Sequence, residues 1–139
     1  MPVLDPYLIF NGNCAEAMAF YAQTLGGDIV MTLRYGESPL AEQCAAGSAE
    51  RIMHTQLRLG DRRLMASDCP PDQAYAGMQC VSLSLSFDTV AEAENISAAL
   101  SENAEVRMAL APTIWAGAFA MLVDRFGTPW MINGAPATP

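Results

Sequence analysis

The chain contains one strand-and-helix pattern twice, and this repeat constrains its fold more than any other feature. The segment Leu8 to Ala17 (LIFNGNCAEA) returns as Leu85 to Ala93 (LSFDTVAEA), one residue shorter. Each copy begins with an apolar stretch and continues through polar residues into an alanine-rich segment. Such self-similarity predicts two structurally related halves within one chain.

Both copies carry the signals of a helix that begins just after the first strand. Asn13 with Glu16 and Thr89 with Glu92 have the spacing of a capping box, in which the first residue caps the helix and the acid follows three positions later. Apolar residues then recur at helical spacing. They are Ala17, Phe20, Tyr21 and Leu25 in the first copy and Ala93, Ile96 and Leu100 in the second. We expect each helix to lie on a sheet.

Three further strands are predicted after each helix, so that each half reads βαβββ. Their ends match, because Leu59-Gly60 and Phe126-Gly127 both lead through a glycine-centred turn into a last apolar strand. The inner strands are expected at 28–35, 52–59, 105–110 and 118–123. The prediction is one α+β domain, 1–139, made of halves at about 5–68 and 80–134. We expect the inserted loop at 36–50 to act as a loose lid.

The composition limits the partners and the compartment. Seven basic residues stand against fifteen acidic ones, a formal charge of −8, which disfavours binding to nucleic acid or to anionic membranes. No secretory signal and no transmembrane run is recognised, and the four cysteines show no C-x-x-C spacing. We therefore expect a cytoplasmic protein with reduced thiols and a small-molecule ligand.

The stretch from Cys80 to Phe87 alternates strictly between apolar and polar residues. In a strand, such alternation puts the two kinds of side chain on opposite faces. The apolar face should meet a helix. The serine face, Ser82, Ser84 and Ser86, should then look into any cup that the sheet encloses, where a ligand would bind.

Several separate stretches resemble the PhnB-like family of the vicinal-oxygen-chelate superfamily, the glyoxalase, bleomycin-resistance and dioxygenase proteins. They are 7–21 (YLIFNGNCAEAMAFY), 54–68 (HTQLRLGDRRLMASD), 112–116 (PTIWA) and 124–133 (DRFGTPWMIN). The resemblance implies two βαβββ modules that form a curved, mostly antiparallel mixed sheet around a cup, and a homodimer. Relatives of this fold include enzymes as well as proteins that bind antibiotics without reaction, so the fold alone does not choose a function.

Metal-dependent relatives carry one His or Glu on the first and last strand of each half. The matching positions here are about Tyr7 and Ile9, Met65 and Ser67, Ser82 to Ser86, and Met131 and Asn133. Divalent ions of this chemistry prefer imidazole or carboxylate ligands, which these positions lack. We therefore predict no metal site and no cofactor, with a divalent metal as the alternative.

His54, the only histidine, is the best single candidate for a catalytic group, although an isolated histidine in a sheet is more often structural. Asp68 could orient His54 or simply cap the next turn. A nucleophilic pair of Cys69 with His54 lacks any feature that would activate the thiol. The expected ligand-binding residues are Tyr7, His54, Ser67, Asp68, Ser84, Trp115, Phe119, Met121 and Trp130.

Two classes of function remain open. The first is a metal-free small-molecule-binding protein with an unidentified ligand. The second is a lyase, isomerase or oxygenase of the same fold, in which Glu37 or Glu42 of the long loop joins His54 in a dimer. The sequence has no dinucleotide-binding glycine motif, P-loop or serine nucleophile elbow. It also gives no support to the methyltransferase label that is sometimes attached to the family.

Overall fold

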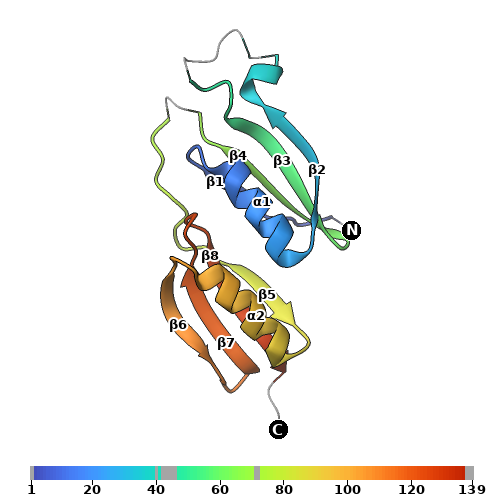
Figure 1. Cartoon of the computed structure of the whole chain (residues 1–139), viewed down its shortest axis with the longest axis vertical. Helices are drawn as coiled ribbons and strands as arrows, with labels where there is room; N and C mark the ends of the chain where they lie inside the picture. The colour runs from blue at the N-terminus through green and yellow to red at the C-terminus, as the bar shows by residue number, and fades with distance from the viewer. Residues whose placement is uncertain (1, 40, 42–46, 71–72, 137–139) are drawn as a thin grey trace. The chain divides into compact units, whose positions relative to one another are not determined.

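The computed structural model describes residues 2–39, 41, 47–70 and 73–136. The chain divides into two compact units, 1–77 and 78–139. Both units have the element order strand, helix and three strands, as Figure 1 shows. In each unit the first strand pairs in parallel with the last, and the other pairings are antiparallel.

The first unit contains a four-stranded sheet in the order β1-β4-β3-β2, with a helix on one face. Its elements are β1 (Tyr7–Phe10), α1 (Cys14–Leu25), β2 (Asp28–Arg34), the short 3₁₀ helix η1 (Tyr35–Glu37), β3 (Ile52–Leu59) and β4 (Arg62–Asp68). The loop expected to be a lid lies partly outside the described residues, and Glu42 is among those that are not described. Its two described ends are joined where the Gly36 N–H donates to the Ala49 carbonyl over 3.0 Å.

The second unit repeats this arrangement, with the strand order β5-β8-β7-β6. Its elements are β5 (Leu83–Phe87), α2 (Val90–Ser101), β6 (Glu105–Ala111), β7 (Ala116–Val123) and β8 (Pro129–Pro136). The strand expected to start at Cys80 is shorter than predicted. Cys80 has a left-handed φ of 61° and Val81 is 67% exposed, so the ladder begins only at Leu83.

The two helices begin where the sequence predicts, but they are held differently. The Thr89 hydroxyl accepts a hydrogen bond from the Glu92 N–H at 3.1 Å, which confirms the predicted cap of α2. The predicted cap of α1 is wrong in its chemistry, because the Asn13 side chain makes no cap hydrogen bond. Instead, the Cys14 N–H donates to the carboxylate of Asp68 over 3.0 Å. A residue at the end of β4 thus does what Asn13 was expected to do.

One face of each sheet packs on its helix and forms a core. In the first unit Phe10, Leu57 and Ala66 have no exposed surface, nor have Ala17 and Tyr21 of α1. Side chains alternate along each strand, so their neighbours in the chain lie on the face opposite α1. We call this the open face of the first sheet. It includes Tyr7, Ile9, Met31, Leu33, His54, Gln56, Arg58, Arg63, Met65 and Ser67.

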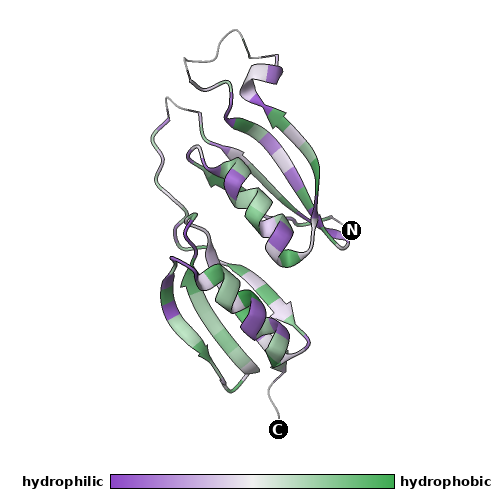
Figure 2. Cartoon of the chain, in the orientation of Figure 1, coloured by the Kyte–Doolittle hydropathy of each residue, from purple (hydrophilic) through white to green (hydrophobic). Residues whose placement is uncertain are grey.

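The second sheet has a helix face and an open face of its own. A Cβ built on Gly134 would lie 2.5 Å from the Cβ of Ala93 in α2, which fixes Gly134 on the helix face. Colouring by hydropathy shows hydrophilic segments on β3, whereas β7 is hydrophobic along its length (Figure 2).

The predicted α+β class with two βαβββ modules is confirmed, and it takes the form of two open four-stranded mixed sheets. Neither described helix has the length and apolar character needed to cross a membrane.

Candidate functional site

The open face of the first sheet brings Tyr7 and His54 together. The phenol oxygen lies 3.0 Å from His54 Nδ1, and the two rings stack with centroids 5.6 Å apart. Because β4 lies between β1 and β3, this contact crosses over β4. Ser67 of β4, which pairs with Ile9 of β1, is only 8% exposed. Three of the predicted residues, Tyr7, His54 and Ser67, therefore gather on one face.

Two further polar residues extend this contact into a chain of hydrogen bonds. Gln56 Nε2 lies 2.9 Å from His54 Nε2, and the Arg63 guanidinium donates to Gln56 Oε1. We call Tyr7, His54, Gln56 and Arg63 the polar chain. Both nitrogens of the only imidazole are thereby engaged, one by a phenol and the other by an amide.

Apolar side chains lie beside the polar chain on the same face. Tyr7 pairs with Met65, Met65 pairs with Gln56, and Gln56 pairs with Met31, so these four residues form one row across the sheet. Met31 is 43% exposed and Ile9 in the next row is 41% exposed. The face thus offers apolar surface next to hydrogen-bonding groups, the combination that small-molecule sites use.

Asp68 does not join this site, because its side chain lies on the helix side of the sheet. It is 2% exposed, and its carboxylate accepts the backbone N–H groups of Gly12 at 2.8 Å, Cys14 at 3.0 Å and Ile52 at 2.9 Å. The alternative in which Asp68 orients His54 is therefore wrong. Burial, together with the negative charge of Asp68, raises the pKa of the Cys14 thiol to about 12.

Cys69 is buried among partners other than His54. Its thiol lies 3.4 Å from Asn11 Oδ1 and 3.9 Å from Arg51 Nη1, and Arg51 also donates to the Cys69 carbonyl at 3.0 Å. These contacts tie the end of β4 to the loop before α1. The described contacts do not form the pair of Cys69 and His54 that was considered from the sequence.

The second unit gathers four of its predicted residues around its own open face. Trp115 is 56% exposed and meets Phe119 edge to face at 5.2 Å. Met121 pairs with Met131, and Ser84 accepts a hydrogen bond from the Asn133 amide at 3.2 Å. This face is largely apolar, with one short polar contact at β5 and β8.

Trp130 lies on the opposite face of that sheet, contrary to the expectation that it lines a ligand cup. It is 2% exposed, pairs with the buried Leu122, and donates its indole N–H to Asp124 Oδ2 over 2.8 Å. Trp130 and Gly134 are four residues apart on β8, so they lie on the same face of the sheet, and Gly134 packs against α2. Trp130 is a core residue, and its polar atom is satisfied by the turn between β7 and β8.

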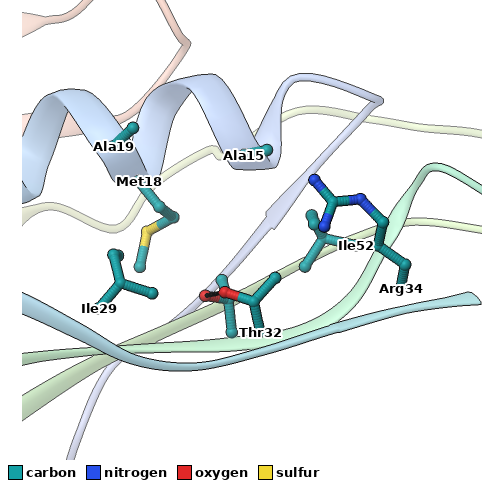
Figure 3. A pocket seen from close by; sticks show the side chains of 8 residues that line it. Ala15, Met18, Ala19, Ile29, Thr32, Arg34 and Ile52 are labelled. Atoms are coloured by element: carbon teal, nitrogen blue, oxygen red, sulfur yellow. Dashed lines mark hydrogen bonds between the residues drawn. The ribbon is translucent and has the colours of Figure 1, made fainter. Parts of the chain in front are cut away.

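A separate cavity of about 270 Å³ lies between α1 and the strands β2 and β3 (Figure 3). Met18, Ile29 and Ile52 supply apolar walls, and Arg34 lies at one end. Its hydroxyls are used internally, since Thr32 and Thr55 are 3.2 Å apart and Thr55 donates to the Met31 carbonyl at 2.9 Å. Arg34 pairs with Glu50 at 3.6 Å. This cavity therefore presents few polar groups to a ligand.

Comparisons with known proteins place the chain in a family. The family model described as 3-demethylubiquinone-9 3-methyltransferase matches residues 3–133. The chain belongs to this PhnB-like family. Protein YjdN of Escherichia coli is 35% identical, over 98% of this chain and 97% of its own. The crystal structure of PA1353 from Pseudomonas aeruginosa is 45% identical, with a TM-score of 0.90, and covers 97% of this chain and 98% of its own.

More distant structures show the same fold. A PhnB protein from Bacillus cereus, described as a putative 3-demethylubiquinone-9 3-methyltransferase, is 22% identical with a TM-score of 0.80, over 95% of this chain and 98% of its own. The fosfomycin resistance protein FosX from Mesorhizobium loti is 7% identical with a TM-score of 0.62, over 96% of this chain and 92% of its own. The vicinal-oxygen-chelate fold predicted from the motifs is thereby confirmed.

A divalent metal, which relatives of this fold can use, does not fit the residues that the structure describes. The open faces carry phenol, thioether, hydroxyl and amide groups at the strand positions that would supply ligands. Within the described ranges, no three His, Cys, Asp or Glu side chains are grouped closely enough to hold a metal ion. The single imidazole is bonded at both nitrogens.

Sequence reasoning missed Gln56 and Arg63, although the sequence contained the signal. Gln56 is two residues from His54 on one strand, so the two side chains share a face. The two-residue turn Gly60-Asp61 puts Arg58 opposite Arg63. Arg58 is two residues from Gln56 on β3, so all three side chains lie on the same face of the sheet. A register drawn through this hairpin would have put Arg63 beside Gln56.

Proposed function

We propose that this PhnB-like protein binds a small molecule on the open face of its first sheet, without a metal. The observation that carries the proposal is the polar chain of Tyr7, His54, Gln56 and Arg63 beside the exposed side chains of Ile9 and Met31 and the half-buried Met65. Polar groups that are fixed by one another and still reach solvent are the usual means of orienting a ligand.

Binding is a better-supported role for His54 than catalysis. A general base needs a ring nitrogen that is available to the substrate, and both nitrogens of His54 already have partners in the protein. The features of the face therefore favour recognition over proton transfer. The rival enzymatic reading requires residues outside this face, such as Glu37, which is exposed in η1.

Fragment screening by NMR would test the proposal. The protein, with ¹⁵N-labelled backbone and ¹³C-labelled methionine methyl groups, would be mixed with a set of small carboxylates, alcohols and amines. We expect the hits to shift the signals of Ile9, His54 and Met65. Hits confined to the cavity under α1, seen at Met18 and Ile52, would overturn the proposal, as would a screen with no hits.

A metal assay supplies an independent check. Protein prepared in chelator should bind the same fragments with unchanged affinity, and elemental analysis of untreated protein should find less than one ion per chain. Fragment binding that is lost in chelator and restored by Mn²⁺ or Zn²⁺ would show that a metal belongs to the site.

A further inference from the structure

The direction of every hydrogen bond in the polar chain is fixed by Arg63. A guanidinium has only donors, so Gln56 must turn its Oε1 toward Arg63. The amide nitrogen of Gln56 then faces His54 Nε2 at 2.9 Å. A flipped amide would put two sets of N–H groups against each other, so the cation selects the orientation of the side chain.

This orientation determines which imidazole nitrogen carries the proton. An amide N–H can only donate, so His54 Nε2 accepts and carries no hydrogen. In the neutral ring the proton then lies on Nδ1, which donates to the Tyr7 oxygen over 3.0 Å. A doubly protonated ring would bring two donors face to face at Gln56.

The Tyr7 hydroxyl consequently keeps its own proton for another partner. Its oxygen receives a hydrogen bond from His54, so its O–H must point away from the imidazole. Tyr7 is 43% exposed, and among the residues that the structure describes its oxygen has no hydrogen-bond partner besides His54. A directed donor therefore stands at the edge of the apolar row formed with Met65.

A second group of donors belongs to Arg63. Within the described part of the chain, no carboxylate lies within 4.0 Å of its guanidinium, and Arg63 is exposed. The Asp5 carboxylate accepts the backbone N–H of Arg63 at 3.5 Å and makes no ion pair with its guanidinium. The first unit also holds five of the seven basic residues of the chain, all of them arginine. At physiological salt, ions in solution screen charges over about 10 Å. The overall charge of −8 therefore does little to repel an anion that lies next to Arg63.

We propose that the ligand of this face is a small carboxylate with an apolar body. The Tyr7 O–H donates to a carboxylate oxygen, the positive charge of Arg63 at the other end of the polar chain attracts the anion, and the apolar body lies on Ile9 and Met65. This proposal rests on the proposed function and adds the chemical class of the ligand. The donors on the face have no free acceptor within the polar chain and are exposed to water, so a ligand that brings an acceptor can replace that water. Charge assistance makes an oxyanion the strongest such acceptor.

The proton position can be measured without any ligand. His54 is the only histidine, so ¹⁵N-histidine NMR gives one pair of ring signals. At about pH 8, where imidazole is normally neutral, we expect Nδ1 to carry the proton. Gln56→Glu should move it to Nε2, because a carboxylate accepts where the amide donated. A proton on Nε2 in the unaltered protein would overturn the argument for a directed Tyr7 hydroxyl.

Binding is tested with benzoate, benzyl alcohol and benzylamine, which share a ring and differ in charge. Benzoate should shift the Met65 methyl signal at the lowest concentration, and benzylamine should not shift it. Tyr7→Phe and Arg63→Gln should each weaken benzoate binding by roughly tenfold, since the first removes the hydrogen bond to the carboxylate and the second removes the nearby positive charge. Tyr75→Phe and Arg62→Gln are the matched controls. Tyr75 donates to the Ile9 carbonyl, and Arg62 precedes Arg63 on the other side of the strand.

The outcomes separate this inference from the function on which it rests. If benzyl alcohol or benzylamine binds the face as tightly as benzoate, the carboxylate class is wrong while the binding face stands. If no probe and no fragment perturbs the face, both proposals fail. If Arg62→Gln weakens benzoate as much as Arg63→Gln does, the attraction is general charge and the specific site is refuted.

Discussion

The two halves put different residues at the same place in their folds. Phe10 at the end of β1 pairs with Asp68, and Phe87 at the end of β5 pairs with Gly134. The Asp68 carboxylate binds the backbone at the start of α1. Gly134, which has no side chain, lets α2 pack so closely that a Cβ added there would lie 2.5 Å from the Cβ of Ala93. One topology thus secures a helix start in two ways, by a distant carboxylate or by a local cap with close packing.

The largest effect should follow from removing Asp68. Asp68→Ala leaves three buried or partly buried backbone N–H groups without their acceptor, and we expect a loss of about 4 kcal/mol or more in the free energy of unfolding. Urea titration measures it, with Asp61→Ala in the exposed hairpin turn as the control. Equal stability of the two variants would show that the carboxylate does not hold the first half.

A smaller effect is expected at the equivalent position of the second half. Gly134→Ala forces a methyl group against α2, which should cost about 1–3 kcal/mol. In the double variant with Ala93→Gly, the total loss measured by urea unfolding should be less than the sum of the two single losses, because the crowded pair is relieved. Strict additivity would mean that the two side chains do not compete for this space.

The two predicted helix caps provide a matched pair. Thr89→Ala removes a hydroxyl that accepts the Glu92 N–H and should cost about 1 kcal/mol. Asn13→Ala should change stability by less than about 0.5 kcal/mol, since its side chain makes no cap bond. Thermal unfolding of both variants tests the difference. A larger loss for Asn13→Ala would contradict the capping role assigned to Asp68.

The smallest effect concerns Cys14, which is buried beside Asp68. Its pKa is raised from an ordinary 9.0 to about 12, so at pH 8 it should resist iodoacetamide while the exposed Cys80 reacts. Mass spectrometry of the digested protein reports each site. The protonated thiol favours the folded state, and this contribution is lost as the pH rises from 9.0 toward about 12. Rapid alkylation of Cys14 in the folded protein would show that it is not buried.

Local patterns in the sequence predicted the repeat, the helix starts and most of the strands, because these depend on neighbouring residues. The strand Ile52–Leu59 and the Thr89 cap agree with the prediction in every residue. Asn13 could not be judged in this way, since its competitor Asp68 is 55 positions away along the chain. Local chemistry marks where a helix begins without showing which group binds its first N–H.

The candidate site was only partly predictable. Tyr7 and His54 were expected, whereas Gln56 and Arg63 follow only once the hairpin register is drawn. Trp130 was placed on the ligand side together with Met131, although consecutive residues of a strand face opposite ways. Its burial follows from that alternation. The direction of the hydrogen bonds needed the side-chain positions themselves.

The bonds of Asp68 also bear on the order of folding. Its carboxylate accepts the N–H groups of Gly12 and Cys14, and these bonds cannot form until β4 has been brought back to the start of α1 across more than fifty residues. The cap of α2 spans only three residues. Closing a long loop costs chain entropy before any contact repays it, and local contacts form first. We therefore expect α2 to gain its native start early, and α1 to become fixed only in the late steps that complete the first sheet.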